Sequence, residues 1–366
     1  MGPLSEPRLL LDEAKARRNL ARMAARAHKA GVRLRPHFKT HQSQEIGRWF
    51  RDYGVEAITV SSLSMAEYFA ADGWRDITLA FPYHRGMHER AQALAAKLAF
   101  GITIADFDAL DGLRFDHPVD VWLKIDVGNH RTGFEPEDLP ALRKLAAELA
   151  RRDDLRLRGL LAHAGHSYAA RSPEQIAKVH RNSLDVVHAL SEQLADVAGP
   201  LALSIGDTPG CSTQADYPGI DEIRPGNFIF YDLSQWQIGS CAIDDIAVAM
   251  ACPVVSRHPR RGQLVVHGGA VHFSKDSIEL DGQRVFGVAV TPEGNGWGAL
   301  IPEVRLVSLS QEHGIVEAPA EFIERPCPGD ALFFLPVHSC LTVDAMGSCH
   351  MPEGKSVATI RARFSS

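Results

Sequence analysis

The chain has 366 residues, of which 45% are hydrophobic and 23% charged. This ordinary balance excludes disordered, collagen-like and coiled-coil proteins. Lys and Arg number 39 against 45 Asp and Glu, and the net charge of −6 offers no surface-wide attraction for nucleic acid or an anionic membrane. The length favours two domains, or one large barrel with an appendage.

The N-terminal segment contains a run of only three leucines between charged residues. Such a run is too short for the core of a signal peptide or for a membrane span, so we expect a cytoplasmic protein. Six cysteines are scattered through the chain without a CxxC pair, which disfavours a disulfide scaffold. Any cysteine with a function is therefore expected to act as a thiolate.

Short apolar runs alternate with amphipathic stretches through the first two thirds of the chain. The runs predict eight strands near residues 33–38, 56–61, 76–81, 98–104, 119–126, 157–163, 201–205 and 223–230. The stretches predict helices over residues 13–30, 43–53, 64–72, 86–97, 136–151 and 173–197. Eight βα units in about 230 residues fit a closed (β/α)8 barrel, with an open doubly wound sheet as the alternative.

The pattern changes after about residue 245. The following segments are strand-like and broken by Gly and Pro: 246–255, 263–267, 284–290, 331–335 and 356–364. We therefore predict two domains, a barrel over residues 1–240 and an all-β domain over residues 241–366.

Three loops after predicted strands carry residues suited to an aldehyde cofactor. Lys39 is a candidate nucleophile, because a lysine beside other cations can form a Schiff base. Arg131 lies between glycines, and the segment 204–210 offers small residues and backbone N–H groups for a phosphate. Each loop alone is an ordinary βα turn more often than a binding site. Together they predict pyridoxal phosphate.

The predicted β domain contributes a candidate metal pair. If the strand before them continues, His338 and Cys340 project from the same face. An imidazole and a thiolate favour zinc, and two ligands leave positions open for water or substrate. A packed pair is the alternative. His313 is a possible third functional group, with a simple turn histidine as the other interpretation.

Several motifs occur in the order found in the family of D-threonine aldolases and D-serine dehydratases. They are RPHFKTH, GNHRTG, LAHAGHSY, SIGDTPG, EIRPGNFIFYD, EHG and PVHSCLTVD, and the resemblance spans residues 8–363. That family belongs to the alanine-racemase-like, fold-type III pyridoxal phosphate enzymes. The resemblance implies a barrel, a C-terminal β domain, and a homodimer with active sites near the subunit interface.

The resemblance also implies roles for individual residues. It implies that Lys39 binds the cofactor, that Arg131 and Tyr231 contact it, and that His338 and Cys340 hold zinc or another divalent ion such as manganese. The turn formed by Gly206, Asp207 and Thr208 would bind the phosphate. Two positions depart from the family pattern: His163 stands where many relatives have tyrosine, and Asp207 where glycine is common.

These parts predict a lyase acting on D-3-hydroxy amino acids. With Lys39 as the base and a metal on the β-hydroxyl, the product is a 2-oxo acid plus ammonia. If His313 or His163 deprotonates that hydroxyl instead, an aldehyde and glycine result. The His-x-Cys pair favours the D-serine dehydratase type over the aldolase type. An amino-acid racemase and a non-catalytic pyridoxal phosphate carrier are further alternatives.

Overall fold

The computed structural model describes residues 3–294, 296–351 and 353–364, and the chain divides into two compact units. The barrel unit comprises residues 21–39 and 46–226. The β-rich unit comprises residues 1–20, 40–45 and 227–366. The units therefore interleave along the chain, and the boundary near residue 240 stays a prediction.

The barrel unit is built on eight parallel strands. They are β2 (Arg33–Leu34), β3 (Ala57–Val60), β4 (Asp76–Pro82), β5 (Ala99–Ile104), β6 (Val119–Ile125), β7 (Leu155–Ala162), β8 (Ala202–Ile205) and β9 (Glu222–Ile223). Their order is β2-β9-β8-β7-β6-β5-β4-β3, and a parallel bridge between His37 and Thr59 joins the two ends. The sheet is thus a nearly closed barrel, which confirms the predicted fold and excludes the open doubly wound sheet.

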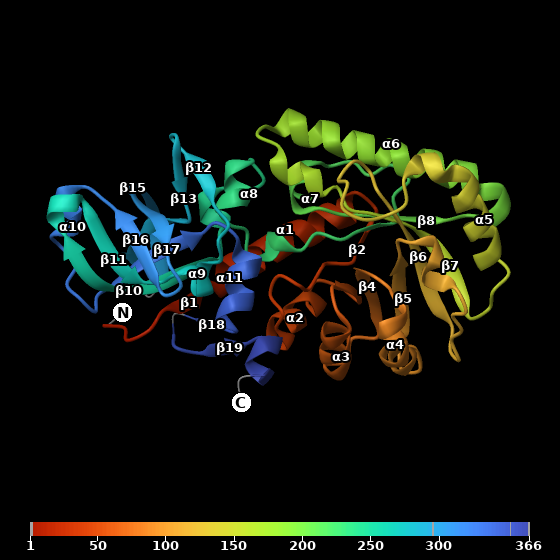
Figure 1. Cartoon of the computed structure of the whole chain (residues 1–366), viewed down its shortest axis with the longest axis horizontal. Helices are drawn as coiled ribbons and strands as arrows, with labels where there is room; N and C mark the ends of the chain where they lie inside the picture. The colour runs from red at the N-terminus through yellow and green to blue at the C-terminus, as the bar shows by residue number, and fades with distance from the viewer. Residues whose placement is uncertain (1–2, 295, 352, 365–366) are drawn as a thin grey trace. The chain divides into compact units, whose positions relative to one another are not determined.

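Helices follow the barrel strands and lie outside them (Figure 1). They are α2 (Gln44–Arg51), α3 (Leu63–Ala71), α4 (His88–Ala95), α5 (Leu139–Leu149), α6 (Pro173–Ala198) and α7 (Thr208–Thr213), while α1 (Glu13–Lys29) spans the division between the units. Helix α6 shows why the boundaries were readable. The Ser172 hydroxyl accepts the Gln175 N–H, Pro173 occupies the first turn, and Gly199 ends the helix with φ +70°.

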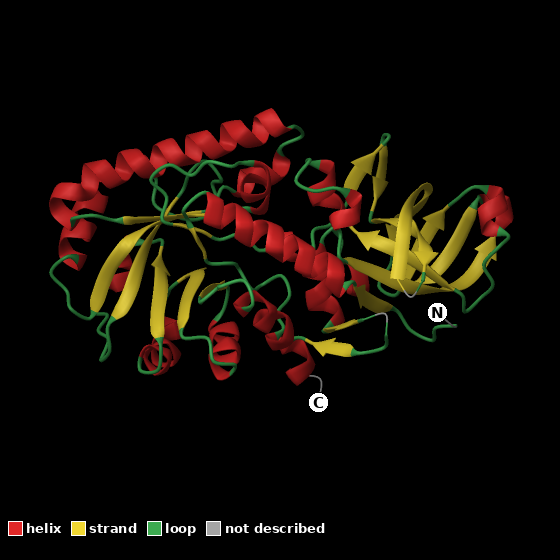
Figure 2. Cartoon of the chain, turned by 180° about the vertical axis from the view of Figure 1, so that it is seen from behind, coloured by secondary structure: helices red, strands yellow, loops and turns green. Residues whose placement is uncertain are grey.

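The β-rich unit contains a nine-stranded, mostly antiparallel sheet (Figure 2). Its order is β11-β16-β15-β14-β17-β10-β1-β18-β19, and β11 also pairs with β10. The strands are β1 (Arg8–Leu11), β10 (Val248–His258), β11 (Gln263–His267), β14 (Gly287–Glu293), β15 (Gly296–Leu309), β16 (His313–Glu317), β17 (Ala331–Pro336), β18 (Ser348–His350) and β19 (Ser356–Ala358). Strand β1 joins this sheet between β10 and β18, far from them in sequence.

Smaller elements complete the β-rich unit. They are the hairpin of β12 (Ile278–Leu280) and β13 (Gln283–Val285) and the short helices α8 (Leu233–Gln237), α9 (Ala270–Phe273), α10 (Ala320–Ile323) and α11 (Ser339–Met346). The six cysteines, all within the described residues, form no disulfide. None of the helices within the described residues is long and apolar enough to cross a membrane.

Candidate active-site halves in the two units

Lys39 lies just beyond the point where the barrel closes. The bridge from His37 to Thr59 precedes it, and the backbone N–H of Lys39 donates to Nδ1 of His37 over 3.2 Å. The Lys39 side chain is exposed. Because Lys39 follows this parallel bridge in the chain, it lies beyond the carboxyl end of a barrel strand. Barrel enzymes bind their ligands at that end.

Two residues near Lys39 in sequence do not supply free positive charge. Arg35 donates to Glu222 over 2.7 Å and to Asp76 over 2.5 Å, so two carboxylates balance its charge. Burial lowers the pKa of His41 to about 3, so this imidazole is neutral near pH 7. Neither residue therefore places an unbalanced positive charge beside Lys39.

The cations around Lys39 come from other strands instead. Burial, and then the charges of Arg224 and Arg131, lower the pKa of Lys124 to about 7. Burial also holds the pKa of His163 well below its ordinary value, and the charges of Lys124, Lys39 and Arg131 act in the same direction. The barrel thus brings Lys39, Arg131 and His163 together in an environment rich in positive charge, which suits an anionic ligand.

The loop that carries Arg131 is organised by Asp126, the residue after strand β6. Its carboxylate accepts the backbone N–H groups of residues 128–131 over 2.8 to 3.2 Å. His130 within this loop has φ +48°, a left-handed conformation that is uncommon outside glycine. One buried carboxylate therefore shapes the whole GNHRTG turn and fixes where the Arg131 backbone lies.

The proposed phosphate turn begins where β8 ends. A Cβ on Gly206 would lie 2.8 Å from the backbone of Arg224, so only glycine fits at this approach. The Asp207 carboxylate caps α7 by accepting the Gly210 N–H over 2.6 Å, and it also accepts the Ser167 hydroxyl over 2.8 Å. The carboxylate is thus occupied inside the turn, and the Thr208 backbone N–H lies 3.5 Å from the Tyr168 hydroxyl.

Two histidines of the LAHAGHSY segment stand beside these loops. Nδ1 of His163 donates to the Gly206 carbonyl over 2.5 Å, which leaves Nε2 as a hydrogen-bond acceptor in the neutral ring. The His166 ring faces Gly128 of the Arg131 loop, and its Nδ1 is buried without a hydrogen-bond partner. A buried polar atom of this kind needs a partner, which a bound ligand would supply.

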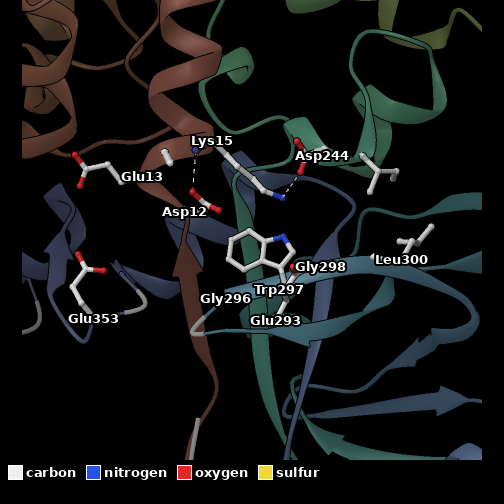
Figure 3. Close-up of a pocket in the computed structure, with 13 residues that line it drawn as sticks. Asp12, Glu13, Lys15, Asp244, Glu293, Gly296, Trp297, Gly298, Leu300 and Glu353 are labelled. Carbon is white, nitrogen blue, oxygen red and sulfur yellow. Dashed lines mark hydrogen bonds and ion pairs between the residues drawn. The ribbon is translucent and has the colours of Figure 1, made fainter.

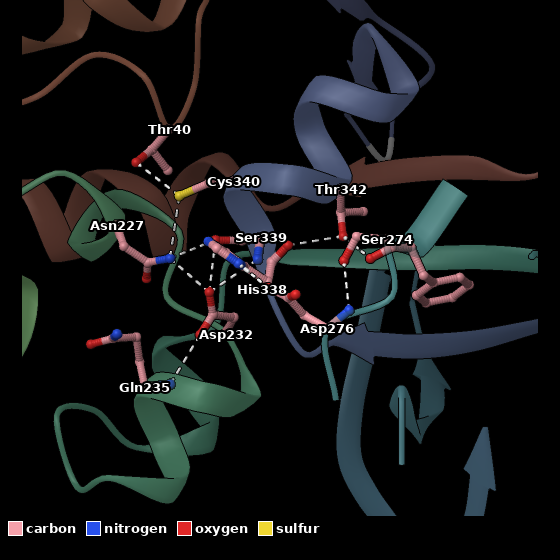
Figure 4. A network of polar contacts seen from close by, with 11 residues as sticks. Thr40, Asn227, Asp232, Gln235, Ser274, Asp276, His338, Ser339, Cys340 and Thr342 are labelled. Carbon is pink, nitrogen blue, oxygen red and sulfur yellow. Dashed lines mark hydrogen bonds and ion pairs between the residues drawn. The ribbon is translucent and has the colours of Figure 1, made fainter. Parts of the chain in front are cut away.

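In the β-rich unit, the predicted contact Tyr231 belongs to a short segment that also reaches the metal pair. Tyr231 is buried, has φ +50°, and donates its backbone N–H to Asn227 over 2.8 Å. The Asn227 amide nitrogen lies 2.6 Å from Asp232 and 3.5 Å from Sγ of Cys340 (Figure 4). Asn227 therefore links the segment of Tyr231 to both Asp232 and Cys340.

The metal pair itself does not lie on a continued strand, and that part of the prediction is wrong. Strand β17 ends at Pro336, His338 is the residue before helix α11, and Cys340 lies in its first turn. The two side chains nevertheless meet. Although burial lowers the pKa of His338, hydrogen bonds to Asp276 and Cys340 raise it to about 11. The helix start, not strand alternation, brings the imidazole and the thiol together.

His313 opens β16 and is exposed, opposite His267 of β11 in the register. The adjacent carboxylate of Glu312 lies 3.4 Å from Nε2 of His267 and 3.8 Å from Nε2 of His272. The backbone N–H of Gly269 donates to Nδ1 of His272, so the neutral ring carries its proton on Nε2, the nitrogen nearer Glu312. The catalytic role of His313 stays a prediction.

A pocket of about 950 Å³ also lies in the β-rich unit, and none of the predicted site residues lines it (Figure 3). Lys15 lines this pocket, and its Nζ lies 3.1 Å from Oδ1 of Asp244 and 5.4 Å from the centroid of the Trp297 ring. The acidic groups on one wall are occupied, because Asp12 caps helix α1 and Glu13 pairs with Arg17. The residues predicted to bind the cofactor or the metal therefore do not line this pocket.

In comparison with known proteins, two different family models match two successive parts of the chain. A family model of the alanine racemase N-terminal domain matches residues 11–234, and a model of a serine dehydratase domain matches residues 247–351. D-threo-3-hydroxyaspartate dehydratase from Delftia sp. strain HT23 is 32% identical, with 93% of this chain and 92% of that protein covered. D-serine dehydratase from Dictyostelium discoideum is 28% identical over 95% and 93% of the two chains.

D-threonine aldolase from an Arthrobacter species is 24% identical, over 91% of this chain and 85% of that protein. Among solved structures, the Delftia dehydratase superposes with a TM-score of 0.89 at 28% identity, over 98% of this chain and 99% of that one. Structures of two alanine mutants of a D-threo-3-hydroxyaspartate dehydratase, one of a histidine and one of a cysteine two residues later, are also similar, and the cysteine mutant is titled as the metal-free form.

The relatives are named dehydratases and aldolases, and the match covers both units of the chain. The chain therefore belongs to the D-serine dehydratase and D-threonine aldolase family, pyridoxal phosphate-dependent lyases with an alanine-racemase-like fold.

Proposed function

We propose that this enzyme dehydrates a D-3-hydroxy amino acid to a 2-oxo acid and ammonia, as a D-serine dehydratase does. The single observation that carries this proposal is the His338–Cys340 pair, combined with relatives named D-serine and D-threo-3-hydroxyaspartate dehydratase. Pyridoxal phosphate supplies an electron sink for the bond that breaks at Cα, and a divalent ion supplies a Lewis acid for the β-hydroxyl.

The residues of the barrel unit fit the cofactor. Lys124, Arg131 and Arg224 give an excess of positive charge that suits a phosphate ester, and the Gly206 turn offers backbone N–H groups. The unpartnered Nδ1 of His166 needs a polar ligand atom. We propose Lys39 as the point of attachment, with Arg131, His163 and the turn formed by Gly206, Asp207 and Thr208 as contacts from this unit. Tyr231, a residue of the β-rich unit, is proposed as a further contact on the family resemblance alone.

The residues of the β-rich unit fit a metal ion. An imidazole and a thiol in hydrogen-bond contact are a donor pair that zinc prefers, and manganese is a possible substitute. Structures of D-threo-3-hydroxyaspartate dehydratase mutants change a histidine and a cysteine with the same spacing as His338 and Cys340, and that of the cysteine mutant is titled as the metal-free form. This supports assigning the metal to this pair.

The proposed roles of the chain's own groups concern protons. Nζ of Lys39 would hold the cofactor in the resting enzyme, and during turnover it would act as the base that takes the proton from Cα of the substrate. Nε2 of the neutral His163 accepts a hydrogen bond in place of the tyrosine hydroxyl of many relatives. Water is then lost across Cα and Cβ, and hydrolysis gives the 2-oxo acid and ammonia.

The test is incubation with D-serine, D-threonine and D-3-hydroxyaspartate, with oxo acid, aldehyde and racemised product assayed separately. We expect oxo acid as the main product, and its loss after chelation without loss of the cofactor absorbance. Aldehyde plus glycine as the main product would favour the aldolase, whose name several relatives carry. Racemised product that survives verified metal removal would overturn the lyase assignment for this chain.

A homodimeric state and a cytoplasmic location are further proposals, carried by the family resemblance and by composition. Sedimentation of the active enzyme and fractionation of cells that produce it test them. A fully active monomer would contradict the first, and recovery outside the cytoplasm would contradict the second.

A further inference from the structure

A carboxylate outside the motifs contacts the proposed metal ligand His338. Oδ2 of Asp276 lies 2.6 Å from Nδ1 of the His338 ring, although 62 residues separate them in sequence. An imidazole that donates Nδ1–H to a carboxylate keeps the lone pair of Nε2 free for a metal, and the carboxylate makes that nitrogen a better ligand. Asp276 therefore decides both the orientation of the ring and the nitrogen it presents.

The backbone between α9 and Asp276 adopts an unusual conformation that brings this carboxylate to His338. Ser274 has φ +72° and ψ −179°, a region that glycine adopts readily and other residues rarely. Its hydroxyl accepts the N–H of Asp276 over 3.2 Å, and Thr342 of α11 donates to the carbonyl of Phe273 over 3.3 Å (Figure 4). A strained residue is retained where the surrounding contacts require it, and here the turn aims Asp276 at His338.

The other carboxylate of this region is already engaged. Asp232 accepts the backbone N–H and the hydroxyl of Ser339, the Asn227 amide and the N–H of Gln235. It therefore fixes the start of helix α11 and leaves the Nδ1 proton of His338 to Asp276. On the cysteine side, Thr40 shares a hydrogen bond of 3.2 Å with Sγ of Cys340.

We infer that Asp276 is a positioning residue, which holds the His338 imidazole in the ring orientation and tautomer that bind the metal. This inference rests on the proposed metal site at His338 and Cys340. It adds a group that the sequence motifs did not include, on a turn whose strained serine has no other evident purpose in the described part of the chain.

The test is the zinc affinity of Asp276→Asn, measured by competition with a chelator on enzyme that retains its cofactor but has been stripped of metal. We expect the dissociation constant for zinc to rise about 10- to 100-fold. In cobalt-loaded protein the thiolate band of Cys340 should persist while the ligand-field bands shift. The melting temperature of the metal-free variant should match that of the wild type. The matched control is Asp281→Asn, which changes an exposed aspartate of the same unit that pairs with Arg305.

The possible results distinguish the role of Asp276 from the proposed metal site at His338 and Cys340. If Asp276→Asn binds zinc as tightly as the wild type, with the same cobalt spectrum, the positioning role is wrong and the metal site stands. If the wild type binds zinc no more tightly than His338→Ala does, the metal site itself is wrong. A loss of zinc affinity matched by equal destabilisation of the metal-free variant would show a structural role and overturn the inference.

Discussion

In the barrel unit, Lys39, Arg131 and Gly206 each follow a parallel strand, whereas in the β-rich unit His338 and Cys340 lie where a strand gives way to helix α11. The strand ends of a barrel meet at one rim, so sequence position alone brings the first three together. The metal pair depends on partners distant in sequence. Asp276 lies 62 residues from His338, and Thr40 lies 300 residues from Cys340.

This difference indicates that substitutions in the two units should impair the enzyme in different ways. In the barrel, the groups that matter are charged and crowded, and their electrostatics are sensitive to pH. In the β-rich unit, the ligands are few and their orientation depends on hydrogen bonds from separate segments. A substitution in one half is therefore expected to spare the signature of the other, the cofactor absorbance or the bound metal.

The largest effect is expected for Lys39→Ala. Loss of the attachment point and of the base together should lower turnover at least about 10³-fold, while zinc content stays at the wild-type level. Steady-state rates and metal analysis measure both. In the wild type, borohydride reduction followed by peptide mapping should find the cofactor on Lys39. Lys97→Ala, an exposed barrel lysine, is the control. An adduct on another lysine would refute the assignment.

Cys340→Ala is expected to have the opposite pattern, with loss of the metal and retention of the cofactor. Without the thiolate, zinc affinity and turnover should fall together, turnover by about 10²-fold or more, because the β-hydroxyl loses its Lewis acid. The absorbance of the bound cofactor should remain, and added zinc should not restore full activity. Cys327→Ala changes an exposed free cysteine of the same unit and should have no effect. Full activity in metal-free Cys340→Ala would contradict the comparison between the two halves.

Lys124→Met should show how much the buried charge of Lys124 lowers the free energy of unfolding. The pKa of Lys124 is about 7 in the folded protein and 10.5 ordinarily, so the folded state binds fewer protons between these values. The wild-type stability contributed by this group therefore rises with pH through that window. In cofactor-free protein, the variant should be more stable by about 2 kcal/mol below pH 7, and the difference should vanish above about pH 10. Denaturant unfolding across pH measures this.

The control for that experiment is Lys97→Met, which should show no such pH-dependent difference. If Lys124→Met were no more stable than the wild type at pH 6, the burial of a charged lysine in the barrel would not carry the expected penalty. The cation-rich description of this half-site would then be wrong.

The smallest effects are expected from two helix caps of the barrel unit. Ser172 caps α6 and Asp207 caps α7 in the same way, so Ser172→Ala and Asp207→Ala should each destabilise the protein by about 1 kcal/mol. Only Asp207→Ala should also weaken cofactor binding, by about fivefold, or ~1 kcal/mol. Equal cofactor affinity in the two variants would mean that the α7 turn does not bind the phosphate.

Much of the barrel was predictable because its signals are local. The helix predicted over residues 173–197 forms over Pro173–Ala198, since a serine cap, a proline and a terminal glycine mark its ends. The strand predicted over residues 119–126 forms over Val119–Ile125. Lys124 inside that apolar run indicated a buried charge, and the sequence analysis did not single it out.

The β-rich unit was predictable in class but not in detail. Alternation and turn residues indicated strands, yet pairing of β1 with β10 joins segments some 240 residues apart, for which no local pattern exists. The extended continuation expected for His338 and Cys340 was wrong, because the chain turns into α11 directly after β17. Asp276 had no motif to mark it.

The amino-acid sequence by itself determined the alternation of strands and helices and the family motifs, because each is contained in windows of a few to some twenty residues. The closure of the eight strands into a barrel rather than an open sheet was decided by the tertiary structure. The tertiary structure decided which side chains meet. Arg35 is neutralised by Glu222 and Asp76, and His338 receives Asp276, only because packing brings distant segments within hydrogen-bond distance. Such contacts depend on the relative placement of whole elements, and local propensity carries no information about that placement.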